Sequence, residues 1–81
     1  MSKNLTIRYF AGFRESAGID EETVSLSAET ARDVFHLLRS RHGSAEPLAH
    51  CKVAINDEMA DWDTAVDDGD TILLFPPVAG G

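Results

Sequence analysis

Two segments near the start of the chain alternate apolar and polar side chains. Residues 5–10 (LTIRYF) and residues 22–27 (ETVSLS) each place an apolar side chain at every second position. That period of two is typical of a strand with one buried face. The intervening residues 11–20 (AGFRESAGID) are too polar for a strand, so they predict a loop or a single helical turn. The two strands can pair as an antiparallel hairpin.

The period changes at Thr30. The apolar residues that follow fall at i, i+3, i+4 and i+7, which is one stripe of a helix; they are Ala31, Val34, Phe35 and Leu38. Thr30 and Asp33 resemble a capping box at the start of this helix. Basic side chains gather near its end, and Gly43 supplies a left-handed stop. The pattern therefore predicts one long helix between Thr30 and Gly43.

The second half of the chain returns to the pattern of strands. After an interruption at Pro47, residues 51–57 (CKVAIND) predict a strand that ends in a turn. A short strand is expected around residues 59–62, a turn at 67–70 (DDGD) and a final strand at 71–75 (TILLF).

The order of these elements leaves one helix to cover one face of a mixed sheet of four to five strands. This is the α+β arrangement known as the ubiquitin-like β-grasp. A parallel pairing of the first and last strands would bring the C-terminus to the middle of the sheet. With 81 residues and no internal repeat or linker, the chain predicts a single domain over 1–81. Residues 76–81 are expected to leave this domain as an extended tail.

The composition is that of a globular protein with an acidic surface, because the formal net charge is −7. Such a surface repels phosphate backbones and anionic lipids, so nucleic acid and membranes are poor candidates for partners. A basic protein is a better one. The alternative is that the acidity only confers solubility.

The sequence predicts neither a signal peptide nor a membrane span. No run of about 18 apolar residues occurs, and the N-terminal residues show no apolar stretch after their single lysine. The single cysteine, Cys51, leaves no internal disulfide. A cytoplasmic location is therefore the default expectation.

The body of the domain shows no pattern of a catalytic or metal site. His36, His42 and His50 lie at neither metal-ligand spacing nor helical i, i+4 spacing. Cys51 would point away from its neighbour His50 on a strand, so we interpret it as a buried core thiol. The glycines do not form a phosphate-binding loop. Five acidic residues lack the pattern of a calcium loop, and we assign them turn and solvent-facing roles: Asp61, Asp63, Asp67, Asp68 and Asp70.

The final strand is apolar on both faces. Ile72 and Leu74 share one face, and Leu73 and Phe75 share the other. A sheet covered by one helix needs only one apolar face. Either loops cover the second face, or the surplus pair, Leu73 and Phe75, belongs to a protein-binding patch.

The residues after this strand have the features of a working tail. Pro76 and Pro77 cannot extend a strand ladder, and they bias the residues before them toward extended geometry. Residues 76–81 reach roughly 20 Å at about 3.3 Å each. Gly80 and Gly81 lack a Cβ, so they can thread a narrow channel. Terminal glycines alone favour a frayed end, but the prolines and the apolar strand favour a tail that presents its terminal carboxylate to a reagent.

The C-terminal motif FPPVAGG, preceded by DDGDTILLF, resembles that of the MoaD family, the small sulfur-carrier subunits of molybdopterin synthase. The segment YFAGFRESAG at 9–18 resembles the first-strand segment of that family. VAIND at 53–57 resembles its central turn, which usually has Val-Asn in place of Ile55 and Asn56. The likeness spans most of the chain, and the terminal motif is highly specific.

The resemblance implies a reaction at Gly81. An adenylating enzyme resembling ubiquitin-activating enzymes would use ATP to convert the terminal carboxylate into an acyl-adenylate, and a sulfur donor would then replace AMP to give a thiocarboxylate. The large catalytic subunit would receive the tail and transfer the sulfur to cyclic pyranopterin monophosphate, in molybdenum cofactor biosynthesis. The resemblance also implies a heterotetramer with one carrier at each end of a large-subunit dimer. The implied tail residues are Pro76, Pro77, Val78, Ala79, Gly80 and Gly81, with Phe75 and Leu73 as the docking surface.

The chain itself would bind no cofactor and would contribute reagent rather than a general acid or base. Three other functions stay open. The same tail could carry sulfur for thiamin synthesis or tRNA thiolation, although the two prolines favour molybdopterin. It could instead join the chain to lysines as a protein modifier, or the domain could be a plain binding module.

Overall fold

The computed structural model of the protein describes residues 2–43 and 47–76. The elements follow the order predicted from the sequence, with two short helical segments added. They are β1 (Lys3–Tyr9), α1 (Gly12–Ala17), β2 (Glu21–Leu26), α2 (Ala31–His42), the 3₁₀ turn η1 (Leu48–His50), β3 (Lys52–Ile55), β4 (Glu58–Ala60) and β5 (Thr71–Phe75).

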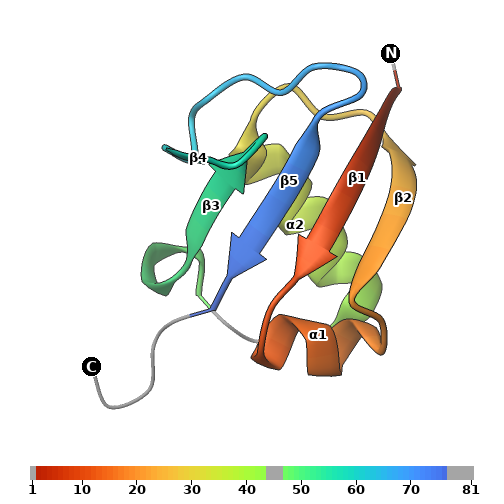
Figure 1. Cartoon of the computed structure of the whole chain (residues 1–81), viewed down its shortest axis with the longest axis vertical. Coiled ribbons are helices and arrows are strands. Elements are labelled where there is room, and N and C mark those ends of the chain that lie inside the picture. The colour runs from red at the N-terminus through yellow and green to blue at the C-terminus, as the bar shows by residue number, and fades with distance from the viewer. Residues whose placement is uncertain (1, 44–46, 77–81) are drawn as a thin grey trace.

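The strands form one mixed sheet in the order β2-β1-β5-β3-β4. β1 and β5 are parallel, whereas the other neighbouring pairs are antiparallel. Figure 1 shows α2 lying across one face of the sheet and α1 at the end of β1. This arrangement confirms the predicted ubiquitin-like β-grasp, including the placement of the last strand at mid-sheet.

The core lies between α2 and the sheet. The period of two in β1 puts Leu5 and Ile7 in this core with no exposed surface, and Val34 of α2 and Ile72 of β5 are equally enclosed. Each such aliphatic side chain contributes about 1.5–3 kcal/mol through the hydrophobic effect. The other face of the sheet is not covered by a helix (Figure 1), so we call it the open face.

The start of α2 is fixed by capping of its free backbone N–H groups. Thr30 Oγ1 accepts a hydrogen bond from the backbone N–H of Asp33, and the Asp33 carboxylate accepts one from that of Thr30, which confirms the predicted capping box. The N–H groups of Ala31 and Arg32 donate to the carbonyl oxygens of Thr64 and Trp62. Because these carbonyls belong to the connection between β4 and β5, capping also attaches that connection to the helix.

Two details differ from the sequence prediction. Residues 12–17 form a helix of six residues rather than a loop or a single turn, and this helix places Phe13 in the core. β4 ends at Ala60, before the predicted limit, because Trp62 leaves the ladder. The Trp62 indole N–H donates to the carbonyl oxygen of Cys51, and its ring packs against Phe35.

Candidate functional site

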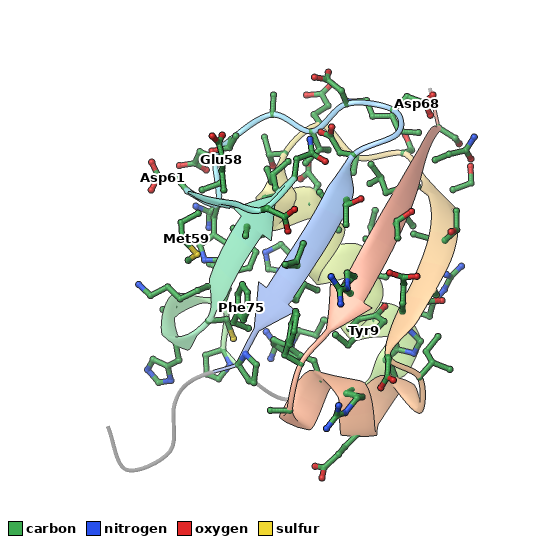
Figure 2. All side chains as sticks on the ribbon, in the orientation of Figure 1. Tyr9, Glu58, Met59, Asp61, Asp68 and Phe75 are labelled. Atoms are coloured by element: carbon green, nitrogen blue, oxygen red, sulfur yellow. The ribbon has the colours of Figure 1, made fainter. Side chains whose placement is uncertain are left out.

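The candidate site begins where β5 reaches the end of the sheet. Figure 2 shows Phe75 at this end of β5, and Pro76, the last described residue, is half-buried. β5 lies between β1 and β3, so the chain leaves the sheet from its middle. The remaining predicted tail residues lie outside the described part of the chain: Pro77, Val78, Ala79, Gly80 and Gly81.

The two faces of β5 have different surroundings. Ile72 and Leu74 belong to the core beneath α2. Leu73 and its cross-strand neighbour Ala54 lie on the open face, outside that core cluster, and yet only 8% and 3% of their surfaces are exposed. Phe75 is half-buried. Of the pair singled out in the sequence, Phe75 therefore presents more of its side chain to solvent.

A second aromatic side chain, which the sequence analysis did not single out, joins Phe75. The rings of Phe10 and Phe75 are stacked, with centroids 4.7 Å apart and planes 17° apart. Phe10 follows β1 directly, and the chain turns sharply at the next residue, Ala11, which has φ 50° and ψ −121°. In the sequence, the period of two places Phe10 on the same strand face as Thr6 and Arg8. The contact between Phe10 and Phe75 becomes visible only through the parallel pairing of β1 with β5.

Met59 extends the same face on the far side of β3. It lies opposite Ala54, and 65% of its surface is exposed, the largest fraction among the exposed large apolar residues of the described chain. Figure 2 shows it at the β4 edge of the sheet. We call the five apolar residues of this surface the open-face patch: Phe10, Ala54, Met59, Leu73 and Phe75.

A polar cluster lies on the helix side of the sheet. The Tyr9 hydroxyl donates to the Glu22 carboxylate, His42 Nε2 lies 2.7 Å from the same oxygen, and Arg41 lies 3.9 Å from the other. Burial tends to raise the pKa of Glu22, but the hydrogen bonds from Tyr9 and His42 and the charge of Arg41 outweigh it, so the pKa is lowered. Burial, together with the hydrogen bond to Glu22, raises the pKa of Tyr9 well above its usual range. The cluster links β1, β2 and α2 and so stabilises the fold.

The acidic residues near the β4–β5 connection also serve the fold. Asp63 pairs with Arg32 at 3.0 Å, Asp68 accepts from the backbone N–H of Asn4, and Asp70 accepts from the side chain of Asn56. These contacts agree with the predicted turn and surface roles. Among the described residues no group of three or more His, Cys, Asp or Glu is placed to hold a metal ion.

Cys51 is 2% exposed, which confirms the predicted buried thiol, and its Sγ lies 3.3 Å from the carbonyl oxygen of Pro47. Within residues 2–43 and 47–76, no helix is long and apolar enough to cross a membrane.

Comparison with known proteins agrees with this architecture. The family model described as "ThiS family" matches residues 7–81. The chain is 38% identical to the molybdopterin synthase sulfur carrier subunit of Haemophilus influenzae over 82 residues, which cover 95% of this chain and 99% of that protein. It is 35% identical to small archaeal modifier protein 3 of Haloferax volcanii over 95 residues, with 95% and 98% coverage.

One of the similar solved structures is a complex of two subunits. The complex of subunits 1 and 2 of the molybdopterin-converting factor from Helicobacter pylori contains a chain that matches with a TM-score of 0.63 and 32% identity, over 96% of this chain and 99% of that chain. The family match, the curated relatives and the β-grasp sheet agree with one another. The chain belongs to the ThiS family and is a ubiquitin-like sulfur carrier of the ThiS/MoaD type.

Proposed function

We propose that this protein is the sulfur-carrying small subunit of a molybdopterin synthase. The observation that carries the proposal is the place of β5: it runs through the middle of the sheet and ends at Phe75, directly before the motif PPVAGG. A domain of this form can hold a narrow tail away from its own body. The identity with the Haemophilus influenzae sulfur carrier subunit supports the choice of pathway.

In this proposal the reacting group is the main-chain carboxylate of Gly81. An activating enzyme uses ATP to form the acyl-adenylate, because a carboxylate becomes an electrophile only when its oxygen is turned into a leaving group. A sulfur donor then displaces AMP and leaves a thiocarboxylate. The large subunit takes up the tail, and the sulfur passes to cyclic pyranopterin monophosphate. Gly80 and Gly81 have no side chains to obstruct that approach.

The open-face patch is the docking surface in this proposal. It lies beside the root of the tail, which is Pro76. It contains two stacked aromatic rings, Phe10 and Phe75, and the exposed Met59. Aromatic residues and methionine are enriched in protein interfaces. The Helicobacter pylori complex supports a second subunit as the partner. We further propose a heterotetramer with one carrier at each end of a large-subunit dimer.

Intact-mass analysis of the protein from its own cells tests the proposal. A fraction of the molecules should be heavier by the exchange of one oxygen for one sulfur, and purification should bring down the large subunit. A variant with one residue added after Gly81 should keep its fold and lose the heavier species, because its terminal carboxyl lies beyond the diglycine. Absence of both the heavier species and the large subunit from the wild-type preparation would refute the proposal.

A second candidate function is protein modification, which the 35% identity to small archaeal modifier protein 3 favours. In that case Gly81 forms isopeptide bonds with lysines, and a ladder of conjugates resistant to denaturant should appear on blots. Carriage of sulfur for thiamin or tRNA instead predicts that deletion of the gene leaves molybdoenzyme activity intact. Loss of that activity selects the molybdopterin pathway.

A further inference from the structure

The negative charge of the protein is concentrated in one segment. Residues 57–70 contain seven of the fourteen acidic residues and none of the seven lysines and arginines, so the rest of the chain is neutral by formal count (seven acidic against seven basic). Figure 2 shows Asp68 at the end of the molecule opposite to Phe75. The net charge therefore does not describe the surface beside the root of the tail.

Two cations border the apolar residues at that surface. Arg8 of β1 is the register partner of Leu73, and Lys52 of β3 is the register partner of Phe75. The Arg8 guanidinium lies 5.8 Å from the centroid of the Phe10 ring, which stacks on Phe75. Arg8, Phe10, Phe75 and Lys52 thus form a continuous strip across β1, β5 and β3, with an aromatic pair in the middle and a cation at each end.

Both cations are available to a partner. The side chain of Lys52 is exposed and makes no hydrogen bond or ion pair within the described residues. Arg8 is half exposed, and the only ion pair that it makes with a described residue, the exposed Glu21, is loose at 3.6 Å. A surface pair of this kind is weak, so a partner carboxylate can replace Glu21 at little cost.

The acidic residues that precede β5 are too far away to cancel the charge of the strip. Asp70 precedes β5 and Phe75 ends it, so roughly 16 Å of extended chain separates them. The Debye length at physiological salt is about 8 Å. The acidic segment comes closer to the strip at β4, where Lys52 lines a groove together with Glu58 and Asp61. Lys52 thus lies at the border between the two regions.

We propose that the subunit that receives the tail presents an apolar surface bordered by carboxylates, which pair with Arg8 and Lys52. This inference rests on the proposed function and specifies the chemistry of the partner. It differs from the expectation drawn from the net charge, which was a basic partner. The acidic residues near Asp68, at the other end of β5, then face away from the main contact and discourage docking of the partner in the reverse orientation.

The test measures binding of the full-length chain to its large subunit by calorimetry, at low and at high salt. The double variant Arg8→Gln/Lys52→Gln should bind about tenfold more weakly than wild type at low salt, and high salt should narrow the difference. The charge-preserving variant Arg8→Lys/Lys52→Arg should bind within about threefold of wild type.

A matched control separates this effect from net charge. Ser2→Asp/Ser27→Asp also makes the chain more negative by two charges, at exposed positions outside the sheet, and should bind within about twofold of wild type. Circular dichroism verifies that all variants are folded. Undiminished binding by the double glutamine variant, or an equal loss in the aspartate control, would overturn the inference. If wild type itself does not bind the large subunit, the proposed function fails, and the inference fails with it.

Discussion

Glu22 of β2 is enclosed by side chains from two other elements. Its side chain is 18% exposed, although it belongs to an edge strand, and one carboxylate oxygen serves both the Tyr9 hydroxyl and His42. These partners come from β1 and from the end of α2. The residue therefore connects three elements through hydrogen bonds to a charged group, each of which contributes about 1.5–3 kcal/mol.

Glu22→Gln should lower the free energy of unfolding at pH 7 by about 1–2 kcal/mol, because Tyr9 and His42 lose a charged acceptor. The pKa of Glu22 is lowered from 4.5 in the folded protein. Its contribution is therefore complete above the unfolded pKa and is lost as the pH falls through the folded pKa. Urea unfolding between pH 7 and pH 3 should show the wild-type advantage shrinking in that window.

The neighbouring exposed residue supplies the control for this experiment. Glu21→Gln removes only the loose pair with Arg8, so it should change the stability by less than about 0.5 kcal/mol at any pH. A constant difference between wild type and Glu22→Gln across the whole pH range would contradict the assigned role of the carboxylate.

Ala11 carries backbone strain next to the aromatic pair. Its φ of 50° is unfavourable for a residue with a Cβ, whereas Asn56 and Asp57, the other non-glycine residues with positive φ among those described, tolerate this region better. Ala11→Gly should raise the free energy of unfolding by about 1 kcal/mol, because the relief of strain exceeds the entropy cost of glycine. Ala17→Gly, the same change at a helical position, should lower it by a similar amount. Equal destabilisation by both would disprove the strain.

At the scale of elements, the prediction from sequence succeeded where a pattern is local. The helix from Ala31 to His42 was predicted by its apolar stripe, its capping box and Gly43, all within one stretch of chain. The end of β4 was predicted two residues late, because Trp62 fits a strand pattern but is drawn into contact with Phe35 and Cys51 from other elements. Only the assembled fold shows such contacts.

The cap of α2 is open to direct test. Thr30→Ala leaves the backbone N–H of Asp33 without its acceptor, and should cost about 1 kcal/mol of stability. For a domain of this size that corresponds to a fall of roughly 4–8 °C in Tm. Ser40→Ala, on the exposed surface of the same helix, should leave Tm unchanged or slightly raised. A calorimetric scan of both variants decides whether the cap has this effect.

At the scale of the whole molecule, the order of elements was sufficient to predict the β-grasp and the parallel pairing of the first and last strands. It was not sufficient for the site. The stack of Phe10 on Phe75 and the flanking positions of Arg8 and Lys52 depend on strand register. Register depends on how both faces of the sheet pack, so it is set only in the assembled fold. The sequence alone therefore does not show which residues of neighbouring strands lie side by side.

The sheet order predicts unequal local stability. β1 and β5 are central and paired on both sides, whereas β4 has three residues and one free edge. Hydrogen exchange followed by NMR should show the hydrogen-bonded amides of β5 exchanging only through global unfolding. Those of β4 should exchange at least about tenfold faster through local opening. Uniform protection across the sheet would contradict this ranking.

The central place of β5 also affects how the protein folds while it is being synthesised. The ribosome makes this strand after all the others, so a nascent chain that lacks it leaves β1 and β3 with unpaired inner edges. Such a chain exposes strand edges and apolar surface, which are targets for chaperones and proteases. We therefore expect fragments that stop before Phe75 to be degraded, so that the fold itself favours copies in which the segment leading into the tail is complete.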